Sequence, residues 1–369
     1  MKLICFLLLI SYTATAQKNF LIIGTYTSGK SEGIYVYEFD SKTADFKKVS
    51  SIASPNPSYL SISNDQKKVY AVYEEGNNNN VGGSVAAYQF NKTNGTLQLL
   101  SKQLTGSDHP CYVAVDKTGK WVTAGNYTGG SISVMPVDAN GMLGKATVTQ
   151  HFGSSVNAQR QDKPHVHCTY FSKDGKYLLV PDLGIDKVMI YRFNKKNGTL
   201  TPAPQPFATA IPGAGPRHII IAPNNKFAYL MQELSGVVTA YKYNDGRLTN
   251  IQNISAAPQG FTGYMGSADI HISPDGKFLY CSNRGESNSI TIFKIDATTG
   301  RLQFVNNSSC LGEAPRNFNF DPSGNFLLVA NQKSDAINIF KVDKQTGLII
   351  NTGKLIEVGN PVCLKWITQ

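Results

Sequence analysis

SPDGKFLYCSNRGESNSITIFKI, residues 273–295, contains the pattern that decides the fold. It has a tight polar turn at Asp275-Gly276-Lys277, then a short apolar and aromatic run, then a run in which apolar and polar residues alternate. Equivalent turns recur about every 50 residues, which is typical of repeat architectures. They begin at Asp65, Thr118, Asp174, Asn224, Asp275 and Ser323. Short runs of β-branched and aromatic residues between such turns predict strands.

Each repeat has room for four antiparallel strands, which is one blade of a β-propeller. Residues 20–26 and 33–40 resemble the second and third strands of a blade, and residues 360–367 can supply its first strand. Closing the ring with both chain ends hides sheet edges that would otherwise pair with other chains. We therefore predict an all-β, seven-bladed β-propeller over residues 17–369, as a single domain with one blade closed by strands from both termini.

The first sixteen residues have the composition of a cleaved signal peptide. A basic start at Lys2 precedes an apolar stretch over residues 3–10, and small residues lie before Gln17. The apolar stretch is shorter than the ~20 residues that a spanning helix needs. We predict an exported protein, periplasmic or extracellular, that does not insert into the membrane after signal cleavage. The alternative is that this segment forms a buried first strand.

The charge and cysteine content narrow the choice of partners. The formal net charge is +10, but the lysines fall mostly at turns and on outward strand positions, with no basic and aromatic cluster on one element. We therefore expect no nucleic acid partner. An odd number of cysteines follows the predicted signal, which excludes complete pairing and favours buried thiols over a disulfide framework. They are Cys111, Cys168, Cys281, Cys310 and Cys363.

Polar residues collect at two places in the repeat, the start of the first strand and the end of the second. Antiparallel pairing brings these two places to the same mouth of the ring. The first column includes His167, Arg217 and Arg316, and the second includes Tyr26, Glu233 and Arg284. The position just before the second column includes Asn126, Asp182, Asn283 and Asn331. Buried charges need partners or a ligand, and the excess of arginine predicts an anionic small molecule.

Three short motifs, in this order along the chain, resemble one known family. They are Lys163-Pro164-His165-Val166-His167, then Gly215-Pro216-Arg217-His218 followed by Glu233, and finally Ser282-Asn283-Arg284-Gly285. Together with Ile23-Gly24-Thr25-Tyr26-Thr27, they are similar to the seven-bladed lactonases. That family includes cycloisomerase-type 6-phosphogluconolactonases and fungal carboxy-cis,cis-muconate lactonising enzymes. The resemblance implies an active site at His167, Arg217, Glu233 and Arg284 that uses no metal and no cofactor.

These residues predict a lactone hydrolase that opens a sugar lactone by general acid and base catalysis, with arginines stabilising an anionic substrate or oxyanion. Either Glu233 or His167 can be the base. Substrate-binding candidates are His165, Arg316, Asn283, Asn331, Asn126, Tyr26 and Asp182. A metal held by His165 and His167 is disfavoured because the arginines would repel a cation. Two alternatives stay open, a muconate-type lactone cycloisomerase and a non-catalytic secreted propeller that binds a glycan or a protein. A closed ring is expected to be a monomer.

Overall fold

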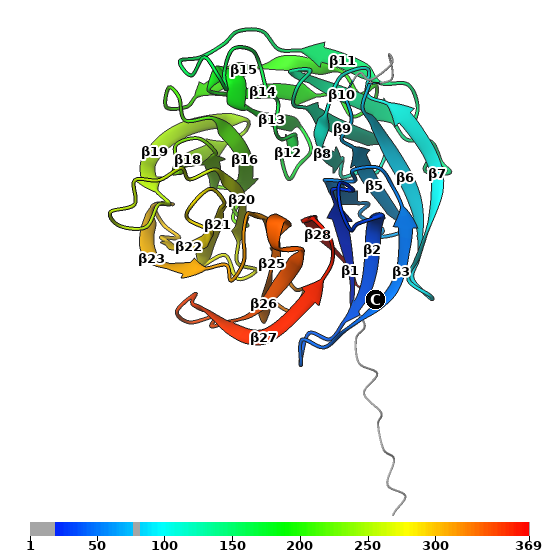
Figure 1. Ribbon diagram of the computed structural model, residues 1–369. Helices are drawn as coiled ribbons and strands as arrows, with labels where there is room; N and C mark the ends of the chain where they lie inside the picture. The colour runs from blue at the N-terminus through cyan, green and yellow to red at the C-terminus, as the bar shows by residue number, and fades with distance from the viewer. Residues whose placement is uncertain (1–18, 77–81, 369) are drawn as a thin grey trace, which may run out of the picture.

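The computed structural model describes residues 19–76 and 82–368, which form a ring of seven four-stranded antiparallel sheets (Figure 1). The first four blades, each from its innermost strand outward, are β28 (Pro361–Thr368), β1 (Asn19–Thr25), β2 (Gly33–Phe39), β3 (Phe46–Ala53); β4 (Leu60–Ile62), β5 (Lys68–Tyr73), β6 (Ser84–Asn91), β7 (Thr96–Leu104); β8 (Pro110–Val115), β9 (Trp121–Asn126), β10 (Ser131–Pro136), β11 (Thr147–Gln150); and β12 (Tyr170–Phe171), β13 (Tyr177–Asp182), β14 (Lys187–Phe193), β15 (Leu200–Thr209).

The other three blades are β16 (Pro216–Ile221), β17 (Phe227–Gln232), β18 (Val237–Asn244), β19 (Arg247–Ser255); β20 (Ser267–Ile272), β21 (Phe278–Asn283), β22 (Ser289–Ile295), β23 (Leu302–Ser309); and β24 (Pro315–Phe320), β25 (Phe326–Asn331), β26 (Ala336–Val342), β27 (Ile349–Glu357). Two single-turn 3-10 helices, η1 (Leu183–Ile185) and η2 (Gln332–Ser334), follow β13 and β25. The predicted fold class is confirmed.

Strands from both ends of the chain close the ring. β28 pairs antiparallel with β1, with Ile23 opposite Leu364, and so becomes the innermost strand of the first blade. In Figure 1 the red β28 and the blue β1 lie side by side, as the sequence predicted. The closure leaves the first blade with the same four-strand order as the other six.

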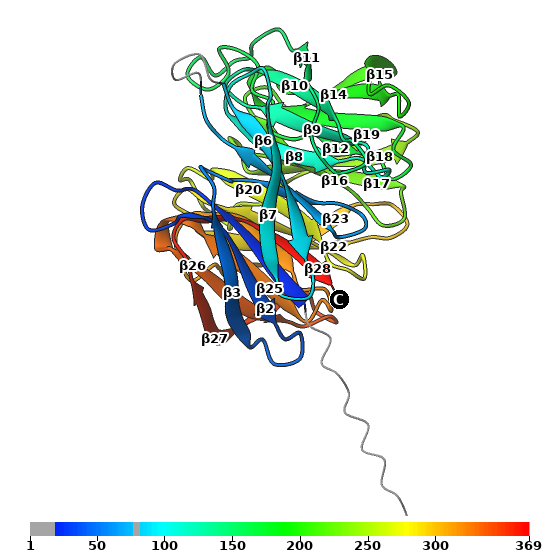
Figure 2. The same cartoon turned by 90° about the vertical axis from the view of Figure 1, so that its right-hand side faces the viewer.

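Burial separates the inner strands of each blade from the outer one. Every residue of β21 is buried, whereas the outer β23 has exposed or half-exposed residues at seven of its eight positions. The blades are stacked face to face around the axis (Figure 2), so second strands are covered by neighbouring blades on both sides. Gly300, at φ 72°, illustrates how closely blades pack, since a Cβ there would collide with the ring of Phe227 in the preceding blade.

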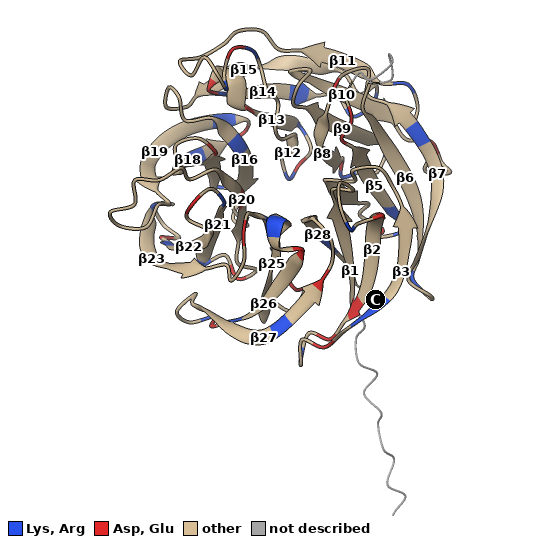
Figure 3. Ribbon diagram, in the orientation of Figure 1, with Lys and Arg blue, Asp and Glu red and all other residues tan. Residues whose placement is uncertain are grey.

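The structure also bears on the predictions about cysteines, the signal peptide, the membrane and the basic residues. Cys111, Cys168, Cys281, Cys310 and Cys363 are buried free thiols, as expected. The predicted signal peptide lies outside the described residues. Within residues 19–76 and 82–368, no helix has the length and apolar character to cross a membrane. Lysine and arginine are spread over several blades in Figure 3 and do not gather on one element.

Candidate active site

The ends of the second strands build the site. In all seven blades, the predicted second column begins one residue after the last residue of the second strand. Asn126 and Asn283, two of these last residues, hydrogen bond inside their own blades, whereas Glu233 and Arg284, each one residue past a strand end, line a cavity at the mouth. Glu233 follows β17 in this way, and Arg284 follows β21. Arg217 comes from the neighbouring inner strand β16, where a register shift between Pro216 and His218 takes it out of the pairing.

Glu233 is the centre of the cluster that the sequence predicted. Its Oε2 lies 2.9 Å from Arg217 Nε and 3.0 Å from Arg284 Nη2. Its Oε1 accepts a hydrogen bond of 2.7 Å from Arg160 Nη2. His167 Nε2 lies 4.0 Å from Oε2. We call Glu233 and these three arginines the Glu233 cluster. Residues from three neighbouring blades, between positions 160 and 284, therefore meet at one carboxylate.

The electrostatics of the cluster assign charge states to its members. Burial by itself would raise the pKa of Glu233, but Arg284, Arg217 and Arg160 outweigh it and hold that pKa far below its ordinary value. Burial, reinforced by the charge of Arg217, keeps the pKa of His167 well below 6.5. Burial also lowers the pKa of Arg284 to about 10, which leaves it charged at neutral pH. A permanent carboxylate, charged guanidinium groups and a neutral imidazole thus face one another.

A second buried carboxylate, Asp269, lies next to this cluster. His218 Nδ1 lies 2.8 Å from its Oδ1, and His271 Nε2 lies 3.0 Å from its Oδ2. The Asn317 side-chain amide also donates to Oδ2. We call these four residues the Asp269 cluster. Arg217 connects the two clusters, because its Nη1 donates to Ala268 O at 2.6 Å and lies 3.3 Å from His218 Nε2.

Two other predicted residues, Tyr26 and Arg316, lie at the same mouth around a different acid. The Tyr26 hydroxyl donates to Glu74 Oε2 at 2.8 Å, and the guanidinium of Arg316 lies 5.2 Å from the centre of the Tyr26 ring. His165 stacks on Tyr127 with ring centres 4.4 Å apart, and Tyr127 also meets His167 edge to face at 5.5 Å. Tyr26, Arg316 and His165 thus lie around the Glu233 cluster and form no hydrogen bond or ion pair with Glu233 itself.

Four residues that the sequence predicted to bind substrate do not belong to the Glu233 cluster. They are Asn126, Asp182, Asn283 and Asn331, the last residues of their second strands, and all four are fully buried. The Asn283 amide donates to Ser289 Oγ and Thr291 Oγ1 in its own blade. Asp182 accepts from His151 Nδ1 at 2.7 Å and from the His165 amide. The physical reason is strand alternation, which turns the last paired residue away from the axis when the next one faces it.

Sequence reasoning missed Arg160. It lies in the segment between β11 and β12, at the longest interval between two repeat turns, and that extra length was the available signal. Its Nη2 also donates to the Tyr127 hydroxyl at 3.2 Å, and its Nη1 to the Tyr264 hydroxyl at 3.4 Å. With Glu233 and Arg284 it lines a cavity of about 540 Å³ at this mouth. The other lining residues are Tyr264, Gly266, Gly285, Glu286, Asn288, Glu313, Ala314, Gln332 and Lys333.

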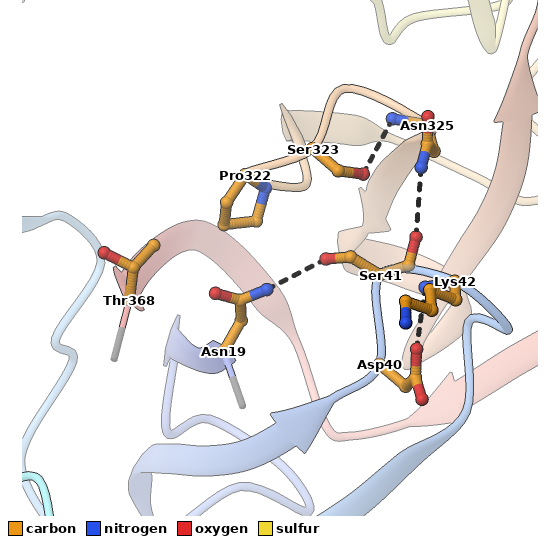
Figure 4. Close-up of a pocket in the computed structure, with 8 residues that line it drawn as sticks. All are labelled: Asn19, Asp40, Ser41, Lys42, Pro322, Ser323, Asn325 and Thr368. Atoms are coloured by element: carbon orange, nitrogen blue, oxygen red, sulfur yellow. Dashed lines mark hydrogen bonds between the residues drawn. The ribbon is translucent and has the colours of Figure 1, made fainter. Parts of the chain in front are cut away.

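A cavity of about 440 Å³ between the first and last blades differs from this one in character. It lies by the turn at Ser323, which the repeat places on the opposite rim, and Asp40 and Lys42 are the charged residues in its lining (Figure 4). Asp40 Oδ1 already accepts from the Lys42 amide at 2.7 Å, and Asn19 donates to Ser41 Oγ at 2.9 Å. In the described part of the chain, no group of three or more His, Cys, Asp or Glu is arranged to hold a metal ion.

Comparison with known proteins identifies the family of this chain. The family model described as "Lactonase, 7-bladed beta-propeller" matches residues 20–366. The 6-phosphogluconolactonase of Bacillus subtilis is 38% identical over 352 residues, which cover 94% of this chain and 98% of the relative. The periplasmic gluconolactonase of Pseudomonas aeruginosa is 38% identical, with a TM-score of 0.90 over 95% of this chain and 99% of that structure.

The closed seven-bladed ring and the family match together define a propeller of the lactonase class. The matched region runs from β1 to β28 and so takes in every blade. The chain therefore belongs to the family of seven-bladed β-propeller lactonases, which are lactone hydrolases, and the family predicted from the motifs is confirmed.

Proposed function

We propose that this chain hydrolyses a sugar lactone of the gluconolactone type at the Glu233 cluster. The observation that carries the proposal is the geometry around Glu233, where charged arginines and the neutral ring of His167 converge on one carboxylate next to an open cavity. Family membership supports the reaction class, and the relatives named 6-phosphogluconolactonase and gluconolactonase support the type of substrate.

In this proposal His167 is the general base and then the general acid. A water attacks the lactone carbonyl carbon while His167 takes its proton, and the carbonyl oxygen becomes an oxyanion. The ring carbon–oxygen bond then breaks, and protonated His167 returns the proton to the departing ring oxygen, which gives the open hydroxy acid. His167 is a neutral imidazole that can accept a proton, whereas the Glu233 carboxylate is already paired with three guanidinium groups.

The arginines and Glu233 have a different part in this proposal. Arg217 and Arg284 carry fixed positive charge to the place where the oxyanion develops, and preformed charge of this kind stabilises a transition state without reorganisation. Glu233 accepts a hydrogen bond from Arg217 and forms an ion pair with Arg284, and so fixes the orientation of both guanidinium groups. It also offsets part of the cost of burying Arg217, whose side chain is only 2% exposed.

A rate measurement with His167→Gln tests the assignment. Opening of glucono-δ-lactone and of its 6-phosphate is followed against the spontaneous rate, and we expect the variant to lose roughly 10²- to 10⁴-fold in kcat. Glu357→Gln, on the exposed outer strand β27, is the matched control and should match the wild type. Unchanged turnover in His167→Gln would remove the proposed base. Turnover of neither lactone, or of a muconate-type dicarboxylate lactone alone, would remove the proposed function.

We also propose that the protein is exported and acts as a monomer. The basic and apolar start of the chain supports export, and one similar structure is that of a periplasmic protein. The closed ring, which leaves no innermost strand unpaired among the described blades, supports a monomer. Expression of the whole chain with its own N-terminus should yield a mature protein that begins at Gln17, and its mass in light scattering should be that of one chain. A cytoplasmic protein that retains Met1 would contradict the first part.

A further inference from the structure

Arg160 differs from the other two arginines of the Glu233 cluster in its hydrogen-bond partners other than Glu233 and in its exposure to solvent. Arg217 donates to the backbone oxygen of Ala268, and Arg284 Nε donates to that of Gly266 at 2.7 Å. Apart from Glu233, the partners of the Arg160 side chain are the hydroxyl groups of Tyr127 and Tyr264. The side chain of Arg160 is 36% exposed, against 2% for Arg217 and 17% for Arg284.

The backbone that carries Arg160 is nevertheless well anchored. The next residue, Gln161, is fully buried, and its side-chain amide donates to Leu183 O at 2.8 Å. Ser155 Oγ donates to Asp186 Oδ2 at 2.6 Å, and Ser155 N donates to Gln161 O at 2.9 Å. The segment is thus fixed to the blade of β13, and the freedom lies in the long side chain of Arg160.

Glu233 can lose Arg160 without becoming an unpaired buried charge. Its Oε2 keeps Arg217 and Arg284, and only Oε1 gives up its partner. Arg160 in turn faces the cavity beside Arg284, while Glu286 and Glu313 lie among the other lining residues with Lys333. Because those carboxylates repel an anion from their part of the cavity, the favourable place for a negative group is next to the two arginines. A guanidinium also matches phosphate and carboxylate in two parallel hydrogen bonds.

We infer that Arg160 is the specificity-determining residue of the site: it exchanges Glu233 for the anionic group of an incoming lactone and so selects phosphorylated or carboxylated lactones over neutral ones. The inference rests on the proposed function and adds to it the substrate class and the residue that reads it. It assigns Arg160 to binding, and it leaves the chemical step to His167, Arg217 and Arg284.

The test compares two lactones in Arg160→Gln. For 6-phosphoglucono-δ-lactone we expect kcat/KM to fall roughly 10- to 100-fold, mostly through KM, because a hydrogen bond to a charged group is lost. For glucono-δ-lactone we expect a change of less than about threefold. Arg160→Lys, which keeps the charge without the fork, should recover part of the loss. Arg192→Gln, at an exposed position of β14, is the matched control and should leave both substrates unchanged.

Equal losses on both lactones, or no loss on either, would overturn the inference. Titration calorimetry with the open acids gives a readout that does not depend on turnover. We expect 6-phosphogluconate to bind the wild type at least about tenfold more tightly than gluconate does, and Arg160→Gln to abolish that difference. If neither lactone is turned over but the calorimetric difference is present, the proposed function fails while the binding role of Arg160 stands. If the wild type shows no preference, the inference fails.

Discussion

Glu233 and Asp269 are both buried carboxylates at the axis, but they are neutralised in different ways. Glu233 is held by three arginines, which are charged at neutral pH. Asp269 is held by His218, His271 and Asn317, and an imidazole, unlike a guanidinium, has a neutral form that gains a proton in acid. The difference indicates that the Glu233 cluster is built to keep one charge state, whereas the Asp269 cluster makes the fold sensitive to acid.

Replacing Glu233 should have the largest effect. Glu233→Gln removes the one carboxylate that Arg160, Arg217 and Arg284 share, and it leaves Arg217 charged and buried. We expect kcat to fall roughly 10³-fold through lost orientation of the arginines, and the free energy of unfolding to fall by about 3–5 kcal/mol. Urea titration and initial rates measure the two quantities. A stable variant with wild-type rates would show that the cluster neither orients nor stabilises anything.

The second largest effect should be a loss of folding stability in acid, which arises at the Asp269 cluster. Burial, followed by the charge of Arg217, lowers the pKa of His218 to about 4. Below its ordinary pKa of 6.5 the unfolded chain binds a proton that the folded protein excludes, so stability is lost as the pH falls from 6.5 to 4. This single group should contribute on the order of 3 kcal/mol to that loss.

His218→Gln measures that contribution. Urea titrations at several pH values between 4 and 7 should show a stability slope that is shallower than that of the wild type by about one proton. His167, whose pKa also lies well below 6.5, supplies acid sensitivity that remains in the variant. An unchanged slope in His218→Gln would mean that His218 is already protonated next to Asp269 in the folded protein.

Asp269→Asn should lower stability and activity less than Glu233→Gln does, and lower stability less than acid does. The amide keeps the shape of the carboxylate but loses its negative charge and one of the two oxygens that accept hydrogen bonds from His218 and His271. We expect a loss of about 2 kcal/mol in stability. We also expect a loss of about tenfold in kcat, because His218 helps to orient Arg217.

The contact between Arg217 and His218 connects the two clusters, so the effects of replacing Asp269 and Glu233 together should not be additive, which a double-mutant cycle measures. Strict additivity would mean that the two clusters are independent.

The smallest effect is expected for Asn283→Ala, one residue away from Arg284. Asn283 hydrogen bonds inside its blade, so its loss should cost about 1–2 kcal/mol in unfolding free energy with little change in KM. A thermal melt and a substrate titration suffice. If KM rises while stability is unchanged, Asn283 faces the substrate, as the sequence pattern first suggested.

Much of the site could be predicted from the sequence because the repeat is regular. Once the turns are aligned, antiparallel pairing alone brings Arg217, Glu233 and Arg284 to one mouth. In the structure, Arg217 Nε lies 2.9 Å and Arg284 Nη2 lies 3.0 Å from Glu233 Oε2. Arg160 was not predicted, because it comes from an insertion outside the period, where only the extra length of the interval was a signal. The direction of Asn126, Asn283 and Asn331 could not be predicted either, since a shift of one residue at a strand end reverses the side a residue faces.

The sequence by itself determined the ring, its seven blades and the closure by both chain ends, because periodic turns and apolar runs are local signals. Only the tertiary structure decided which charges pair. Which atom of Arg217 contacts Glu233, how His218 connects it to Asp269, and that Arg160 completes the cluster depend on side chains from different blades. Ångström-scale distances between such side chains are set by the packing of the whole ring, and no short stretch of the chain specifies them.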